Sequence, residues 1–266
     1  MNKLLMIITV ALGLSACKND NTTSHHQTDE MPTTAPKDSL DMTRYPEAIQ
    51  EVFKAHGGLQ RWDDMKSLTY TMGDQVTITD VDSRDIQIET PTHSIGSRDG
   101  SVWIAQDSTY FPKEQARFYH NLMFYFYAMP FLLADDGIVY SEASPLDKDG
   151  IQYPGIKIAY EDNVGDSPED NYILYYHPET KQMNWLAYTV TYGKNETSDQ
   201  YSFIHYNKWQ EINGLLLPEE LTWYTVENGQ PTDPKGEPRV FTKVDIDAAP
   251  LDPSTFEMPE NGVKVD

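Results

Sequence analysis

The sequence of 266 residues has little cysteine, little positive charge and no long hydrophobic run. Its single cysteine, Cys17, excludes a disulfide bond within the chain. Lys and Arg number 20 against 42 Asp and Glu, so the formal net charge of −22 at pH 7 argues against a nucleic-acid partner. The apolar stretch at residues 4–14 is too short to span a bilayer, which takes roughly 18 or more apolar residues. We therefore expect no transmembrane helix in the mature protein.

Residues 1–16 have the organisation of a secretion signal. Lys3 supplies the positive start, residues 4–14 the apolar stretch, and Ser15-Ala16 the small residues before a cleavage site. Cys17 follows directly, and Leu14-Ser15-Ala16-Cys17 resembles the bacterial lipobox, in which the cysteine is diacylated on sulfur. The resemblance implies that Cys17 is the lipid-attachment site and that the mature chain is anchored to a membrane. The alternative is a free thiol at a different kind of cleavage site.

Composition divides the remaining chain into a tether and a folded domain. From Lys18 to about Arg44 the sequence is polar and has almost no large apolar residues, so it cannot bury enough surface to fold. We expect a lipoprotein signal peptide at 1–16, a lipidated cysteine with a disordered tether at 17–44, and one folded domain at 45–266. In the bacterial sorting rule, Asp directly after the lipidated cysteine retains a lipoprotein in the inner membrane. Lys18 stands there, which favours the outer membrane and leaves its periplasmic face and the cell surface both open.

The folded part reads as one helix followed mostly by strands. A helix is expected from about Tyr45 to Ala55, with Pro46 in its first turn and Gly57-Gly58 at its end. His56 falls at the end of the apolar stripe of this helix, where packing or carbonyl capping is the expected role. Alternation of apolar and polar residues then predicts a mainly β (α+β) domain with antiparallel strands. The strands are expected at 67–72, 76–81, 85–90, 101–106, 153–160, 172–177, 183–192, 201–210, 215–226 and 239–246.

Residues 113–134 form an apolar helical segment that Pro130 interrupts. The part from 122 to 134 is apolar almost all round, so protein, ligand or partner must cover it. It could be a core helix that fills the concave side of a curved sheet. It could also line a cavity for an acyl chain or another apolar ligand. The residues at helical spacing that would line such a cavity are Phe118, Leu122, Phe126, Met129 and Leu133.

Three local patterns together resemble the LolA/LolB type of lipoprotein-carrier domain. They are Ala55-His56-Gly57-Gly58-Leu59, Ile212-Asn213-Gly214-Leu215 and Leu251-Asp252-Pro253. The resemblance covers roughly residues 45–259 and implies a curved, unclosed half-barrel of about eleven antiparallel strands, with helices over a concave face that receives acyl chains. It transfers no individual ligand-binding residue. Soluble carriers of this type have no lipid anchor, so Cys17 makes the chain more similar to the anchored acceptors.

Motifs for catalysis, cofactors or metals are missing. The sequence has no His-Glu-x-x-His, no Gly-x-Ser-x-Gly, no phosphate-binding loop and no dinucleotide glycine triplet. Asp147-Lys148-Asp149-Gly150 is similar to part of a calcium loop but lacks its outer ligands, and we expect a turn. The carboxylate pair Glu219-Glu220 is expected to supply solubilising charge, and Asp135-Asp136 to lie at a helix end. We therefore predict no catalytic residue, no metal and no cofactor, and a protein that is not an enzyme.

The leading interpretation is a membrane-anchored lipoprotein that binds or carries an apolar ligand, such as an acyl chain, a lipid or a lipoprotein, in a half-barrel cavity. The alternative is a surface or periplasmic lipoprotein that binds a glycan or a protein partner without carrying lipid. An enzyme of unfamiliar type is the third possibility. The oligomeric state is left open. Exposed aromatic side chains would serve the glycan or protein partner, and the candidates are Trp103, Trp185, Trp209 and Trp223.

Overall fold

Fourteen strands join into one antiparallel sheet in the described part of the chain. The computed structural model describes residues 40–161, 170–191 and 198–265. The strand order is β14-β5-β4-β3-β2-β1-β13-β11-β10-β9-β8-β7-β6, and β12 pairs with β11. The strands are β1 Ser67–Met72, β2 Gln75–Asp80, β3 Ile86–Glu89, β4 His93–Arg98, β5 Ser101–Gln106, β6 Ile138–Lys148, β7 Ile151–Tyr160, β8 Tyr172–Tyr176, β9 Met183–Tyr188, β10 Ser202–Ile212, β11 Leu215–Glu227, β12 Gln230–Pro234, β13 Arg239–Asp247 and β14 Gly262–Val265.

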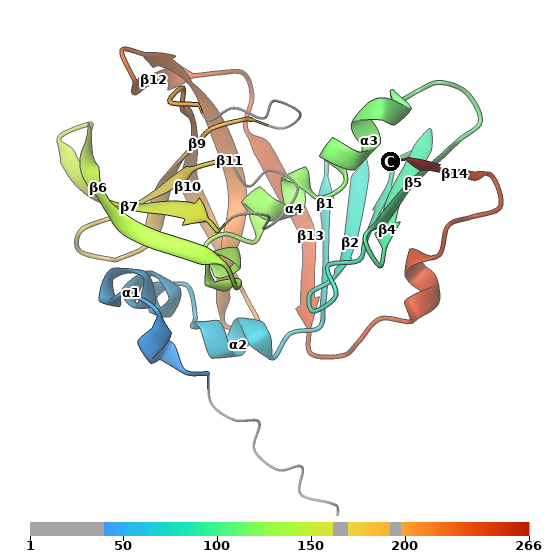
Figure 1. The fold of residues 1–266 in the computed structure, drawn as a ribbon, viewed down its shortest axis with the longest axis horizontal. Coiled ribbons are helices and arrows are strands. Elements are labelled where there is room, and N and C mark those ends of the chain that lie inside the picture. The colour runs from blue at the N-terminus through green and yellow to red at the C-terminus, as the bar shows by residue number, and fades with distance from the viewer. Residues whose placement is uncertain (1–39, 162–169, 192–197, 266) are drawn as a thin grey trace, which may run out of the picture. The chain divides into compact units, whose positions relative to one another are not determined.

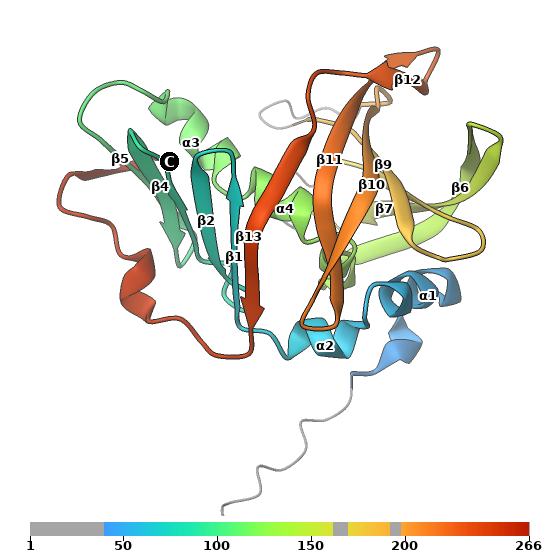
Figure 2. The same ribbon diagram turned by 180° about the vertical axis from the view of Figure 1, so that it is seen from behind.

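The sheet is strongly curved and does not close. Figures 1 and 2 show strands β6 to β11 facing strands β1 to β5 across a concave side that holds helices α3 and α4. The end strands β6 and β14 each pair with one neighbour, and within the described residues no pairing joins them. The expected half-barrel with helices over the concave face is therefore confirmed. The described strands number fourteen, against the eleven or so that the resemblance implies, and four of them, β4, β6, β12 and β14, are not among the ten predicted from alternation.

The first helices lie at the end of the sheet where β1 begins. Helix α1 spans Glu47–Ala55, as expected, and buries Ile49, Val52 and Phe53. Helix α2, Leu59–Asp63, leads directly into β1. Residues before Tyr45 also contact this end, since the backbone N–H of Leu40 donates to Gln60 Oε1 at 3.1 Å and Met42–Arg44 form the 3-10 helix η1.

The apolar segment at 113–134 is split into three pieces. Helix α3 covers Lys113–Tyr119, α4 covers Leu122–Tyr127, and the 3-10 helix η2 covers Phe131–Ala134. Pro130 follows a cis peptide bond and separates α4 from η2, as its missing N–H leads one to expect. The break between α3 and α4, at residues 120–121, was not predicted.

The core lies on the concave side and is rich in aromatic rings. The largest fully buried side chains of this core include Tyr70, Tyr127, Tyr206 and Phe53, whereas Trp185 lies in a second, smaller buried cluster. Tyr127 of α4 lies 4.5 Å from both Tyr70 of β1 and Phe241 of β13, measured between ring centroids. Tyr206 of β10 donates its hydroxyl to Phe126 O at 2.7 Å. These contacts hold α4 against strands β1, β13 and β10.

Two of the three sequence patterns meet at one junction. The N–H of Leu216 donates to His56 O at 2.9 Å, and Arg61 Nη1 donates to Asn213 O at 3.1 Å. Asn213 and Gly214 have φ values of 49° and 75°, as in the tight hairpin turn expected for Asn-Gly. Gly57 lies so close to this turn that a Cβ on it would stand 2.2 Å from Gly214 O. The glycines therefore let helix α1 approach the β10–β11 hairpin.

Candidate functional site

The predicted ligand-binding residues separate into two groups. Phe118, Leu122 and Phe126 line one cleft on the concave side. Met129 and Leu133 are fully buried in the core and are not among the residues that line it. The structure thus brings three of the five residues together at a surface opening, and places the other two behind them as packing.

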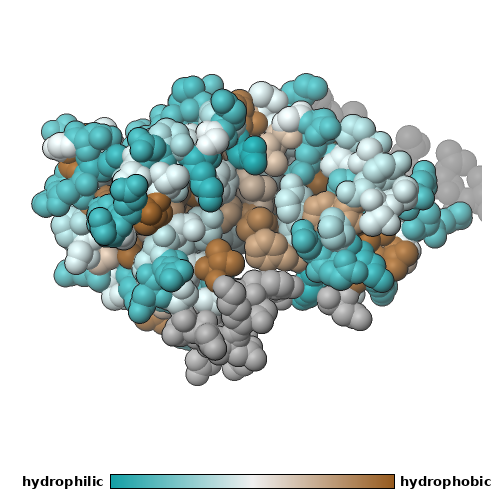
Figure 3. Space-filling view, turned by 90° about the horizontal axis from the view of Figure 1, so that it is seen from above, coloured by the Kyte–Doolittle hydropathy of each residue, from teal (hydrophilic) through white to brown (hydrophobic). Residues whose placement is uncertain are grey.

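The cleft lies between helices α3 and α4 and the strands of the opposite half of the sheet. Its volume is about 850 Å³, within the range of roughly 300–1,000 Å³ typical of small-molecule sites. Figure 3 looks onto this end of the domain and shows hydrophobic residues in a hollow, with hydrophilic residues on both sides of it. The apolar and aromatic residues that line the cleft are Met72, Phe118, Tyr119, Leu122, Met123, Phe126, Tyr188, Val190, Trp223, Pro238 and Val240.

Three aromatic residues form the part of the cleft wall nearest the core. The Phe126 ring lies 4.9 Å from the Tyr188 ring and 5.8 Å from the Trp223 ring, the latter edge-on. Trp223 Nε1 donates to the Tyr188 hydroxyl at 2.9 Å. Burial raises the pKa of Tyr188, and the hydrogen bond from Trp223 partly opposes the shift. Since the indole N–H is bonded to the Tyr188 hydroxyl, this wall presents mainly ring surface to a ligand.

A hydrogen bond holds the opposite wall in place. Tyr119, at the end of α3, donates its hydroxyl to Gln75 Oε1 at 2.8 Å, and Gln75 Nε2 donates to Thr77 Oγ1 at 3.2 Å. Burial raises the pKa of Tyr119, while Gln75 and the nearby Arg239 guanidinium lower it. Helix α3 is thereby linked to the start of β2 at the mouth of the cleft.

Charged side chains of both signs surround the mouth. Asp74 comes from the turn between β1 and β2, Lys235 and Glu237 come from the segment between β12 and β13, and Arg239 is the first residue of β13. All four residues are exposed. The cleft therefore combines an apolar interior with a mixed-charge rim, which suits an amphiphilic ligand.

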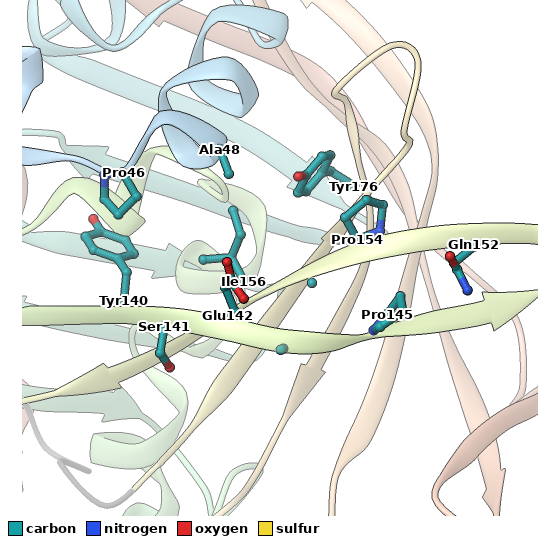
Figure 4. A pocket seen from close by; sticks show the side chains of 12 residues that line it. Pro46, Ala48, Tyr140, Ser141, Glu142, Pro145, Gln152, Pro154, Ile156 and Tyr176 are labelled. Carbon is teal, nitrogen blue, oxygen red and sulfur yellow. The ribbon is translucent and has the colours of Figure 1, made fainter.

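A second hollow lies beside α1, at the free edge of the sheet. Figure 4 shows Pro46, Tyr140, Pro154, Ile156 and Tyr176 around it. Its volume is about 650 Å³, and its polar lining includes Glu142 and Gln152. None of the predicted ligand-binding residues lines it.

His56 and Glu220 each have a hydrogen-bond partner within the protein. His56 is fully buried, its Nδ1 donates to Val52 O at 2.8 Å, and burial lowers its pKa to about 4. This confirms the packing and capping role. The expectation that Glu220 supplies solubilising charge is wrong. Glu220 is only 7% exposed, and Lys208 Nζ donates to its carboxylate at 2.7 Å. Only Glu219 of that pair is exposed.

The acidic segments expected to be turns are turns. Asp149 and Gly150 have positive φ values between β6 and β7, and Asp135 caps the end of η2. Within residues 40–161, 170–191 and 198–265, no group of three or more His, Cys, Asp or Glu is placed to hold a metal ion. In the same ranges no helix is long and apolar enough to cross a membrane.

The tryptophans do not form an exposed platform. Trp103 and Trp185 are 3% and 1% exposed, and Trp209 and Trp223 are half-buried. Trp223 instead lines the cleft, together with Tyr188, which sequence analysis did not single out. The aromatic alternation in both strands was visible, but alternation alone does not say which face of a strand is concave. The interpretations of the signal peptide, Cys17 and the tether up to residue 39 lie outside the described residues.

Comparisons with known proteins give likenesses of fold. No protein-family model and no curated protein matches the sequence. Among solved structures, the chain is similar to a DUF1329 family protein from Desulfovibrio piger, with 10% identity, a TM-score of 0.47, and coverage of 80% of this chain and 98% of that one. A LolA superfamily protein from Nitrosomonas europaea matches with 11% identity, a TM-score of 0.43, and coverage of 75% and 95%.

A third similar structure is an outer membrane lipoprotein-sorting protein domain from Vibrio parahaemolyticus. It shares 7% identity, has a TM-score of 0.38, and the match covers 79% of this chain and 94% of that one. At identities of 7–11%, the three structures are likenesses of fold alone.

Proposed function

We propose that this chain is an envelope lipoprotein, anchored through Cys17 to the outer membrane, that binds the apolar part of an amphiphilic ligand in the cleft beside α3 and α4. The observation that carries the proposal is an open hollow of about 850 Å³ whose wall includes Phe118, Leu122 and Phe126. Such rings and methyl groups gain roughly 25 cal/mol for each Å² of apolar surface that leaves water. An acyl chain or a similar apolar group supplies that surface.

The mouth of the cleft lies at one end of strand β1. The rim residue Asp74 lies in the turn after β1, at the end of that strand remote from α2. Binding or transfer, without chemical conversion, is the activity that this arrangement supports.

The test is a comparison of bound lipid between matched variants of the full-length chain. All variants carry Cys17→Ser, so none receives a covalent lipid and the shared N-terminal segment contributes equally. Leu122→Lys places an ammonium group in the apolar cleft, whereas Val139→Lys places one on β6 at a side chain that is 49% exposed. An unpaired charge in apolar surroundings costs several kcal/mol, so we expect the affinity for an uncharged probe, a fluorescent fatty alcohol, to fall about tenfold or more in Leu122→Lys.

Val139→Lys should bind as the parent does. Lipid extraction and mass spectrometry after gentle purification give the second measurement, and should recover an apolar ligand from the parent and less from Leu122→Lys. If the parent neither retains lipid nor binds the probe, or if both lysine variants bind equally well, the cleft is not a lipid site.

A further inference from the structure

The rim of the cleft carries two bases and two acids. Lys235 and Arg239 face the same opening as Asp74 and Glu237, and all four are exposed. None of the four takes part in the ion pairs found among the described residues. Their charges are therefore available to a ligand whose apolar part occupies the cleft.

The backbone positions of these side chains are well defined. The N–H of Lys235 donates to Trp223 O at 2.7 Å, so this lysine is joined to the strand whose indole lines the cleft. Arg239 begins β13 and stands opposite Leu221 of β11. Asp74 immediately precedes Gln75, which receives the Tyr119 hydroxyl. The mouth thus has two basic groups and one acidic group on the β12–β13 side and a further acidic group on the β1–β2 side.

The charge balance discriminates between kinds of headgroup. A purely anionic headgroup would meet two bases and two acids, in the field of a chain with a net charge of −22. A purely cationic headgroup would be favoured by that field but would lie against Lys235 and Arg239. A headgroup with one positive and one negative group can place each of them beside the opposite charge, with the guanidinium able to bind a phosphate through two parallel hydrogen bonds.

We propose that the cleft prefers a zwitterionic amphiphile, with a phosphate beside Lys235 and Arg239 and an ammonium group beside Asp74 and Glu237. The inference rests on the proposed function, because the same cleft takes the acyl chain. The class that fits is a phosphoethanolamine lipid with a chain seated against Phe126 and Trp223.

The experiment compares three lipids that share one palmitoyl chain and differ in the headgroup. Lysophosphatidylethanolamine is zwitterionic, lysophosphatidylglycerol is anionic and monopalmitoylglycerol is neutral. Their dissociation constants are measured on the full-length Cys17→Ser chain, below the lipids' micelle concentrations, by displacement of a fluorescent fatty acid. Two exposed ion pairs predict a preference of about three- to tenfold for the zwitterionic lipid over the anionic one.

Charge-reversed variants test where the preference arises. Asp74→Lys with Glu237→Lys should reverse the order of the zwitterionic and anionic lipids, and Lys235→Glu with Arg239→Glu should weaken both while leaving the neutral lipid unchanged. Equal affinity of the parent for all three lipids, or an order that the first double variant does not alter, would overturn the headgroup assignment and leave the proposed function intact. Failure of all three lipids to bind would refute the proposed function itself.

Discussion

Replacing Gly57 by alanine tests the junction between helix α1 and the β10–β11 hairpin. Gly57 has a φ of +102°, and a Cβ on it would stand 2.2 Å from Gly214 O and 3.0 Å from Leu215 Cα. Both of these atoms belong to the backbone, so the chain itself must move. The neighbouring Gly58 is the matched control, because its φ is +95° but a Cβ there would meet nothing within 4 Å.

Both substitutions introduce backbone strain, but only Gly57→Ala also forces packed backbone to move. A side chain in a glycine-type backbone conformation costs about 1–3 kcal/mol, and both variants incur that strain. Gly57→Ala adds the displacement of packed backbone, for which overpacking gives about 1–3 kcal/mol more. We therefore expect the free energy of unfolding to fall by about 2–6 kcal/mol in Gly57→Ala and by about 1–3 kcal/mol in Gly58→Ala. A loss of that size is a large part of the roughly 5–15 kcal/mol typical of a domain.

The measurement is urea unfolding followed by tryptophan fluorescence, with the midpoint and slope fitted for both variants and the parent. Trp209 reports on the junction directly, since its ring lies 4.6 Å from that of His56. If Gly57→Ala is no less stable than Gly58→Ala, the close approach of the two glycine motifs does not contribute as argued.

The remaining predictions concern two buried ionisable side chains. Burial lowers the pKa of His56 to about 4, against 6.5 in the unfolded chain. The neutral ring therefore makes its full contribution to the free energy of unfolding above pH 6.5, and this contribution is lost as the pH falls to 4. The loss is about 3 kcal/mol, and His56→Gln should flatten the dependence of unfolding free energy on pH over that interval. An unchanged slope would contradict a neutral buried ring. Glu220→Ala should lower stability by about 1 kcal/mol because it removes the acceptor of two hydrogen bonds, one from Asn207 and one from the exposed Lys208, whereas Glu219→Ala should change it by less than about 0.5 kcal/mol. Thermal unfolding of the two variants side by side tests this, and equal effects would be evidence against a structural role for Glu220.

Strands with regular alternation were predictable from the sequence, and irregular ones were not. Strand β1 was expected at its observed bounds because Leu68 and Tyr70 alternate with polar residues. Strand β6 was missed because Pro145 and a register shift between Ala143 and Leu146 interrupt its alternation. It stands at the free edge of the sheet, where proline and bulges are tolerated since half of its backbone groups face no neighbouring strand.

Of the five residues predicted to line a cavity, three line the cleft and two do not. Phe118, Leu122 and Phe126 follow one another at intervals of four residues, which predicts one side of a helix, and they share the cleft although Phe118 lies on α3 and the other two on α4. The helical spacing was extended to Met129 and Leu133, but α4 ends at Tyr127 and both residues lie in the core. A proline breaks the helix at a predictable place, but the new direction of the chain depends on tertiary packing.

The chemistry of the cleft wall explains how a hollow can persist in so aromatic a protein. Buried tyrosine and tryptophan side chains need hydrogen-bond partners, and in an open cleft water would normally supply them. Here Trp223 Nε1 donates to the Tyr188 hydroxyl, and the Tyr119 hydroxyl donates to Gln75 Oε1. These two donors are therefore bonded to protein atoms instead of to water in the cleft. An entering apolar group displaces weakly bound water without breaking these bonds, so the gain from covering the rings is not offset by lost hydrogen bonds. Trp223→Phe would leave the Tyr188 hydroxyl without this donor and open to water, and should weaken ligand binding more than it weakens the fold.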